Sequence, residues 1–100
     1  MNRTYVGLDL ETTGLDPARD AILEVGAVCF RTYLDNGTVQ AQMVEKWSSL
    51  INPGRPIPIQ IQQLTGITQE DVARAPRFSQ VMHDLRRFVG QHPLVGHNIG

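Results

Sequence analysis

The sequence predicts a mixed α/β domain in which three antiparallel strands are followed by helices and then by a strand reached through a crossover connection. Three observations support this order. Apolar residues alternate with a period of two near the amino terminus, an Asn-Gly pair separates two long strand-like segments, and apolar residues recur at helical spacing further on. A length of 100 residues limits the chain to one small domain.

The first strand is predicted over residues 5–11. One of its faces carries Val6, Leu8 and Leu10, and the other carries Tyr5, Gly7, Asp9 and Glu11. Turn-forming residues follow at 12–17. A second strand over residues 22–30 is apolar and β-branched, which predicts burial on much of both faces. The pair Asn36-Gly37 favours a tight hairpin turn, so a third strand is expected from about residue 38 to residue 50.

Helices are predicted in the second half of the chain. Pro58 favours the first turn of a short helix that runs through Leu64 and ends at Gly66. The run from Thr68 to Asp71 resembles a capping box and opens a second short helix that ends near Ala75. The strongest helical pattern covers residues 78–89, where one face is apolar and the other is largely polar. A last strand is expected over residues 93–97.

The composition is that of an ordinary globular protein, with 41% hydrophobic and 19% charged residues. No apolar run approaches the roughly 18 residues that a membrane-spanning helix needs, and the amino-terminal residues lack the pattern of a secretory signal. The single cysteine, Cys29, cannot form an internal disulfide, so a cytoplasmic location is expected. A net charge of −1 exerts no general attraction on nucleic acid, so such contact would depend on a local arrangement or a bound metal.

Asp9 and Glu11 are the candidate metal ligands. Residues two positions apart on a strand leave the same face, about 6.5–7 Å apart at the backbone, and Gly7 leaves room beside them. Two neighbouring carboxylates repel each other unless a proton or a cation lies between them. Hard divalent ions such as Mg²⁺ or Mn²⁺ prefer such oxygen ligands. A solvated surface explains the same pair without function, and the Asp-x-Glu spacing alone favours that simpler interpretation.

The residues around Asp9 and Glu11 favour the functional interpretation instead. The string Gly7-Leu8-Asp9-Leu10-Glu11-Thr12-Thr13-Gly14-Leu15 resembles the first motif of the DnaQ-like (DEDD) 3′–5′ exonucleases. The segment Leu64-Thr65-Gly66-Ile67-Thr68 is similar to one that packs on the terminal nucleotide in that family, and Gly96-His97-Asn98 is similar to the start of its second motif. The resemblance covers essentially the whole chain. It implies a ribonuclease H-like fold, which agrees with the order of strands and helices derived above.

The resemblance implies a domain that hydrolyses phosphodiester bonds from nucleic-acid 3′ ends. Thr12-Thr13 is typical of its proofreading-type and helicase-associated members; the substrate is DNA or RNA, and a DNA-directed, proofreading type is favoured. It implies two-metal-ion catalysis with Mg²⁺ or Mn²⁺, in which Asp9 and Glu11 are the catalytic residues and metal ligands. The residues implied to hold the terminal nucleotide are Thr12, Thr13, Gly14, Leu15, Leu64, Thr65, Gly66, His97 and Asn98. The implied partners are a single-stranded 3′ end and, in a parent protein, a DNA polymerase or a helicase.

The family requires four acidic ligands and a general base, and residues 1–100 contain only Asp9 and Glu11 of that set. The next acid would follow Asn98 by four positions, and no histidine here begins a His-x-x-x-x-Asp motif. We therefore expect residues 1–100 to be the N-terminal portion of a single exonuclease domain and to be inactive alone, because two carboxylates cannot fix two ions. The alternative is a non-catalytic nucleic-acid-binding or interaction fragment that retains part of the exonuclease fold.

Several other residues allow two interpretations. Glu24, inside an apolar strand, could be a third ligand or a structural acid that accepts hydrogen bonds from the Thr12-Thr13 turn, and the structural role is favoured. His97 and Asn98 fit a cleft lining and an ordinary turn equally well. The aromatic residues are interpreted as core rather than as base-stacking platforms; they are Phe30, Trp47, Phe78 and Phe88.

Overall fold

The computed structural model describes residues 2–14 and 21–96. Its elements follow the predicted order, which is thereby confirmed. They are β1 (Arg3–Thr12), β2 (Ile22–Asp35), β3 (Thr38–Leu50), α1 (Ile59–Thr65), α2 (Gln69–Ala73), α3 (Phe78–Val89) and β4 (Leu94–Gly96). No helix in the described ranges is long and apolar enough to cross a membrane.

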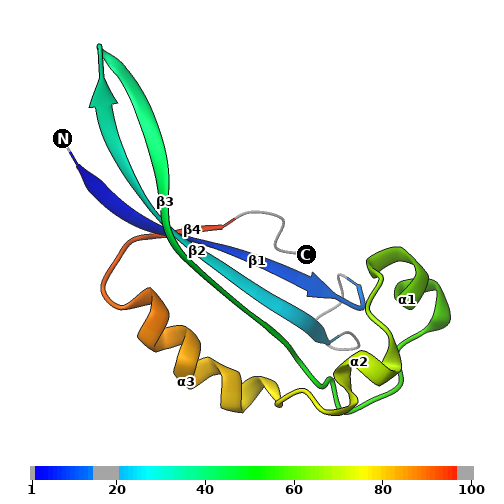
Figure 1. The fold of residues 1–100 in the computed structure, drawn as a ribbon. Coiled ribbons are helices and arrows are strands. Elements are labelled where there is room, and N and C mark those ends of the chain that lie inside the picture. Colours follow the sequence, from blue (N-terminus) through cyan, green and yellow to red (C-terminus); the bar gives the residue numbers. More distant parts are fainter. Residues whose placement is uncertain (1, 15–20, 97–100) are drawn as a thin grey trace.

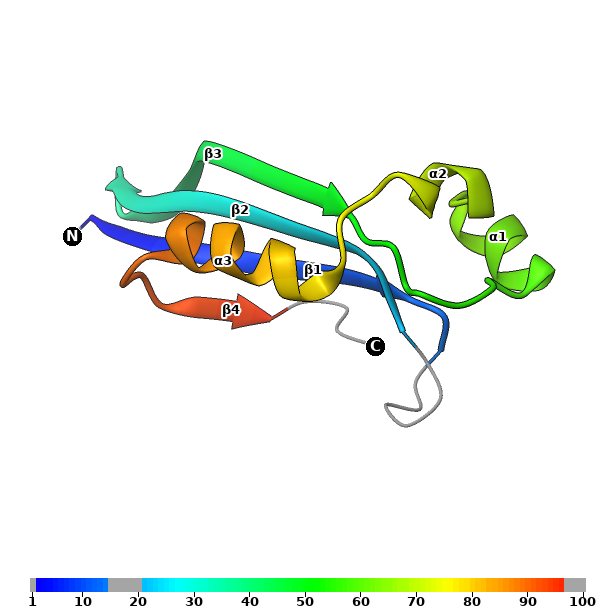
Figure 2. The ribbon, with the colours of Figure 1, turned by 90° about the horizontal axis from the view of Figure 1, so that it is seen from below.

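The four strands form one sheet in the order β3-β2-β1-β4 (Figure 1). β1 pairs antiparallel with β2 and parallel with β4, and β2 pairs antiparallel with β3. A parallel pair needs a crossover connection, and the three helices lie within it. α3 covers one face of the sheet (Figure 2). None of the described helices covers the opposite face, which we call the open face.

The core lies between the sheet and α3. Val6, Ala27 and Cys29 form one buried cluster, and the half-buried side chains of Leu85 and Phe88 pack against it from α3. A second cluster contains Val25, Ile51 and Val81. Leu8 and Leu10 pack against these clusters from β1, which confirms the predicted apolar face of this strand.

β2 is longer than the predicted strand over residues 22–30, and only one of its faces is buried. Leu23, Val25 and Ala27 are buried, whereas Val28 is 37% exposed. The prediction of burial on both faces was therefore wrong. From Glu24 to Leu34 the even-numbered side chains of β2 point to the open face, over which the described residues place no helix. Ile22, on the other side of the bulge at Leu23, packs against the core instead.

The hairpin of β2 and β3 extends beyond the rest of the sheet. Asn36 and Gly37 adopt positive φ angles of 52° and 80°, as the Asn-Gly pair predicts. Strand pairing continues as far as Asp35 opposite Thr38, whereas β1 begins at Arg3. Residues 33–40 therefore pair only with each other, and this hairpin arm projects from the sheet (Figure 1).

A β-bulge decides which side chains of β3 face the core. The pairing shifts between Cys29 and Phe30, which makes Val44 the extra residue. Without that residue, Lys46 would lie opposite Ala27 on the covered face, because a slip of one residue exchanges the two faces of a strand. With it, Trp47 takes this place and its ring lies 6.4 Å from that of Phe88. Lys46 lies on the open face instead.

α1 and α2 are attached to the sheet at the end of β1. A second shift in pairing, between Glu11 and Thr12, leaves Leu23 as an extra residue of β2. Its buried side chain forms a cluster with Ile57, Ile67 and Val72, against which α1 also packs. The predicted capping box of α2 is present, since the Thr68 hydroxyl accepts a hydrogen bond from the Asp71 amide. This packing holds the two short helices beside the acidic end of β1.

Candidate active site

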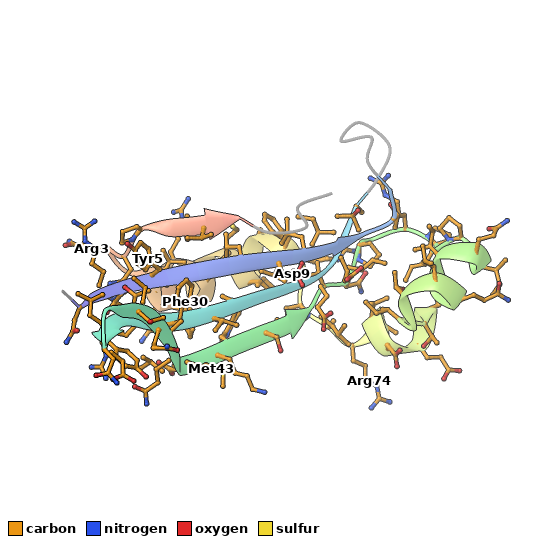
Figure 3. The ribbon with its side chains drawn as sticks, turned by 90° about the horizontal axis from the view of Figure 1, so that it is seen from above. Arg3, Tyr5, Asp9, Phe30, Met43 and Arg74 are labelled. Carbon is orange, nitrogen blue, oxygen red and sulfur yellow. The ribbon has the colours of Figure 1, made fainter. Side chains whose placement is uncertain are left out.

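Asp9 and Glu11 lie among the last four residues of β1, on the open face of the sheet. Both side chains are exposed, while Leu10 between them packs into the core. The alternation of a strand therefore directs both carboxylates to the same side. Figure 3 views this face and shows Asp9 near the middle of the sheet, away from Tyr5 and Phe30.

A hollow of about 580 Å³ adjoins Asp9 on the open face. Gly7 and Gly26 form part of its lining, and Gly26 lies directly opposite Asp9. A Cβ atom added to Gly26 would lie 3.8 Å from the Asp9 carbonyl oxygen, and one added to Gly7 would lie 3.8 Å from the Phe30 ring. These are ordinary contact distances, so the absence of two side chains, rather than tight backbone packing, leaves room beside the carboxylate.

Lys46 and Ser48 complete the wall of the hollow on the β3 side, and Val95 does so on the β4 side. Asp9 and Lys46 are its two charged lining residues. Lys46 and Ser48 cannot be assigned to the site from the sequence, because a register counted from the Asn-Gly turn places both on the face that α3 covers. The signal that could have found them is Trp47, which must be buried and thereby turns its neighbours outward.

The turn after β1 is held by its own hydrogen bonds. The Thr12 hydroxyl donates to the Gly14 carbonyl at 2.6 Å. The Thr13 amide donates to the Ala21 carbonyl, and the Ala21 amide donates to the Thr13 hydroxyl, each at 2.9 Å. These contacts fix Thr12, Thr13 and Gly14 directly behind Glu11. Leu15 lies outside the described residues.

Glu24 lies directly opposite Glu11 on the neighbouring strand and is half-buried. Three carboxylates thus share the open face. However, no three His, Cys, Asp or Glu side chains within residues 2–14 and 21–96 are close enough together to hold a metal ion. Glu24 therefore does not complete a ligand set with the other two acids, and its role as a structural acid stays a prediction.

α1 places the second predicted block beside the end of β1 (Figures 1 and 2). The helix ends at Gly66, whose φ of 77° is left-handed and whose amide donates to the Gln62 carbonyl at 2.9 Å. The Thr65 hydroxyl donates to the Ile61 carbonyl and accepts from the Ile67 amide. Leu64, by contrast, is 82% exposed. An apolar side chain is thus presented to solvent on the helix that lies beside the end of β1.

Two glutamines without any sequence signal of function, Gln62 and Gln69, hold this block in place. The Gln69 side chain accepts from the Ile57 amide at 2.7 Å, and the Gln62 side chain donates to the Ile57 carbonyl at 2.9 Å. The Gln62 side chain also accepts from the Gln69 amide at 3.1 Å. The sequence carries no local signal for this network, because its partners come from three separate segments. His97 and Asn98 of the third block lie beyond the part of the chain that the structure describes.

The chemistry of the acidic pair fits a hard divalent cation. Two exposed carboxylates on one face supply oxygen ligands with a charge of −2 when both are ionised, and the glycine-lined hollow leaves space for water molecules in the coordination shell. Two carboxylates are an incomplete set for an ion that takes six ligands. Further ligands would come from water, from substrate or from residues other than those described.

The topology, with a parallel strand added beside a central antiparallel strand that ends in two acids, defines a ribonuclease H-like exonuclease fold. Exonuclease X in complex with 5′ overhanging duplex DNA is similar, with a TM-score of 0.66 and 28% identity over 93% of this chain and 48% of that chain. The nuclease domain of 3′hExo, a DEDDh family member bound to rAMP, has a TM-score of 0.68 over 97% of this chain and 52% of that chain. Its identity of 23% supports the fold alone.

The chain belongs to the RNase_T family of exonucleases, which it matches over residues 6–100. This confirms the resemblance inferred from the sequence. A PolC-type DNA polymerase III of Thermotoga petrophila is 37% identical over 97% of this chain, and a DNA polymerase III subunit epsilon of Treponema pallidum is 34% identical over 94% of it. The chain spans 6% and 40% of these two relatives.

Replacing Glu24 by Gln is expected to stabilise the fold by about 0.2–1 kcal/mol in the absence of divalent ions, because like charges directly opposite each other on neighbouring strands repel. Denaturant unfolding at neutral pH measures the change. The gain should shrink at about 1 M salt, where charges are screened within about 3 Å.

Glu45→Gln is the matched control, since Glu45 lies opposite the uncharged Cys29. A loss of stability in Glu24→Gln alone would contradict the repulsion and would support structural hydrogen bonds to the Glu24 carboxylate.

Proposed function

We propose that residues 1–100 form the N-terminal portion of a 3′–5′ exonuclease domain that removes nucleotides from DNA 3′ ends in the manner of a proofreading nuclease. The observation that carries the proposal is the pair Asp9 and Glu11, exposed together on the open face at the end of the central strand and beside a hollow. The DNA polymerase III relatives favour DNA as substrate and a polymerase as partner over a helicase.

Asp9 and Glu11 are the proposed ligands of Mg²⁺ or Mn²⁺. When bound between these residues and a phosphodiester, such ions stabilise developing negative charge and lower the pKa of a coordinated water. The contribution of this chain is geometric. Packing of the partly buried Leu10 against the core holds both carboxylates on one face, and the two glycines of the hollow leave the approach to Asp9 open.

The 3′-terminal nucleotide is proposed to lie between the turn behind Glu11 and the end of α1. Backbone groups of Thr12, Thr13 and Gly14 face it from one side, and Leu64 provides an exposed apolar surface for the base from the other. Thr65 and Gly66 fix the direction of Leu64 through the hydrogen bonds that end the helix. The family resemblance adds Leu15, His97 and Asn98 to this proposed contact.

We infer that residues 1–100 do not turn over substrate on their own. They supply two of the four acids and no His-x-x-x-x-Asp motif. The second metal ion therefore lacks its ligands, and the motif that would supply the general base is not among these residues. The chain also spans 48% of the exonuclease X structure that it resembles. The other candidate function is that of a non-catalytic fragment that binds nucleic acid. This candidate is favoured because the described residues contain no third metal ligand beside Asp9 and Glu11.

A labelled single-stranded DNA assay with Mn²⁺ separates the two candidates. The 100-residue chain is expected to release no nucleotides above background. The full-length gene product is expected to release them from the 3′ end, and Asp9→Asn should lower that rate by more than about 100-fold, since even changes of residues around a metal ligand cost 10–100-fold.

Asp84→Asn on the outer surface of α3 is the matched control and should leave the rate unchanged. Undiminished rates in Asp9→Asn would refute its assignment as a ligand. An inactive full-length product would refute the enzymatic proposal and favour the binding fragment.

Leu64→Ala is expected to raise the KM for a single-stranded DNA end by about 5–30-fold with a smaller effect on kcat, because a lost base contact costs about 1–2 kcal/mol of binding. Ile59→Ala, on the same helix and 61% exposed, is the matched control. Equal effects of the two substitutions would show that Leu64 is not a specific contact.

A further inference from the structure

The outer edge of β3 is the longest unpaired strand edge in the described part of the sheet. β3 is the last strand in the order, and residues 38–46 are all exposed. A strand edge offers a row of backbone N–H and C=O groups to any second strand that approaches it. Proteins usually block such edges with charged residues, proline or a bulge.

The first half of this edge lacks such protection. Residues 38–44, which we call the edge segment, have the sequence Thr-Val-Gln-Ala-Gln-Met-Val and contain no charge and no proline. Val39 is 67% exposed and Met43 is 60% exposed. The bulge at Val44 and the charged pair Glu45 and Lys46 follow only at its end. The edge segment is therefore open to pairing, and the second half of β3 is not.

The edge segment is complementary to a second copy of itself. When two copies pair antiparallel about a two-fold axis at Ala41, each Ala41 faces its own copy and Val39 faces Met43 of the other copy. These apolar residues share the open face, since their neighbours on β2 are Thr32, Leu34 and Phe30.

On the opposite face of the same pairing, Gln40 meets Gln42 of the other copy. The Gln42 side-chain oxygen accepts from the Arg31 guanidinium at 3.4 Å, which leaves its NH₂ group as a donor across the interface. Apolar side chains thus meet apolar side chains, and amides meet amides, over residues 39–43.

The edge segment is accessible because it begins in the hairpin arm, at residues 38–40, and continues along the outer edge of β3. The arm is the part of the sheet farthest from the acidic pair. It projects beyond β1 and away from α1 and α2, as Figure 1 shows. The acidic pair lies at the other end of β1, where Glu11 is eight residues from Arg3, or about 26 Å along the strand. Pairing through the edge segment therefore leaves both candidate active sites open.

We propose that this chain forms a two-fold symmetric dimer in which the edge segments of two copies pair antiparallel about Ala41. The two four-stranded sheets then form one continuous sheet. This interface depends on the edge segment of this chain and is independent of the proposed nuclease activity.

Sedimentation equilibrium of the 100-residue chain tests the proposal. The mass should rise with concentration from 11.1 kDa toward twice that value. Ala41→Lys should weaken association by at least about tenfold, because it places two ammonium groups directly opposite each other. Ala41 is exposed, so the monomer fold should keep its circular dichroism spectrum.

Leu34→Lys is the matched control. It places the same charge on the same face one strand further in, opposite Val39 and at a position that is 59% exposed. Leu34→Lys should therefore leave the association intact. A monomer at every concentration, or an equal loss in both variants, would overturn pairing through the edge.

A cross-link gives an independent readout. Directly opposed residues of an antiparallel pair have Cα atoms about 4.5–5.5 Å apart, which lies within the range of a disulfide. Mild oxidation of Ala41→Cys should produce a covalent dimer, whereas Leu34→Cys should remain largely monomeric. Cys29 is buried and should not react. Equal cross-linking of the two variants would contradict the two-fold axis at Ala41.

Discussion

The alternation of β1 is the constraint on which the candidate site depends. Val6 is fully buried and Leu10 packs into the core, so the odd-numbered side chains of this strand must face away from α3. A slip of one residue would bring Asp9 and Glu11 into the core, where an uncompensated charge costs several kcal/mol. The hydrophobic core thus fixes two mutually repelling carboxylates on one open surface. A divalent cation removes that repulsion, which links the stability of the strand to the proposed chemistry.

Much of this fold follows from local signals in the sequence. The period of two in β1, the Asn36-Gly37 turn and the apolar spacing of α3 each identified an element, and each is confirmed. The two bulges could not be predicted in this way. The residue types of Val44 and Leu23 do not mark either position as a bulge. The positions of the two bulges depend on packing between distant segments, such as that of Trp47 against α3. The error about β2 has a related cause, because apolar composition does not show which face a helix will cover.

The candidate site likewise contains one part that local sequence signals predict and one part that depends on distant packing. The shared face of Asp9 and Glu11 follows from strand geometry alone. The location of α1, which carries Leu64, beside the end of β1 does not, because it depends on the cluster around Leu23 that joins α1 and α2 to the sheet. Only the family resemblance pointed to that block from the sequence. The sequence does not place Lys46 at the site, because the bulge at Val44 decides which face of β3 this side chain occupies.

The central claim is that a divalent cation binds between Asp9 and Glu11. Titration of Mn²⁺ into the ¹⁵N-labelled chain tests it most directly, since the paramagnetic ion broadens the amide signals closest to it. Binding between these carboxylates should broaden residues 8–12 and Gly26 first and spare the hairpin arm. Substitution of both acids by their amides should abolish the effect. Broadening that starts elsewhere, or that survives the double substitution, would contradict the claim.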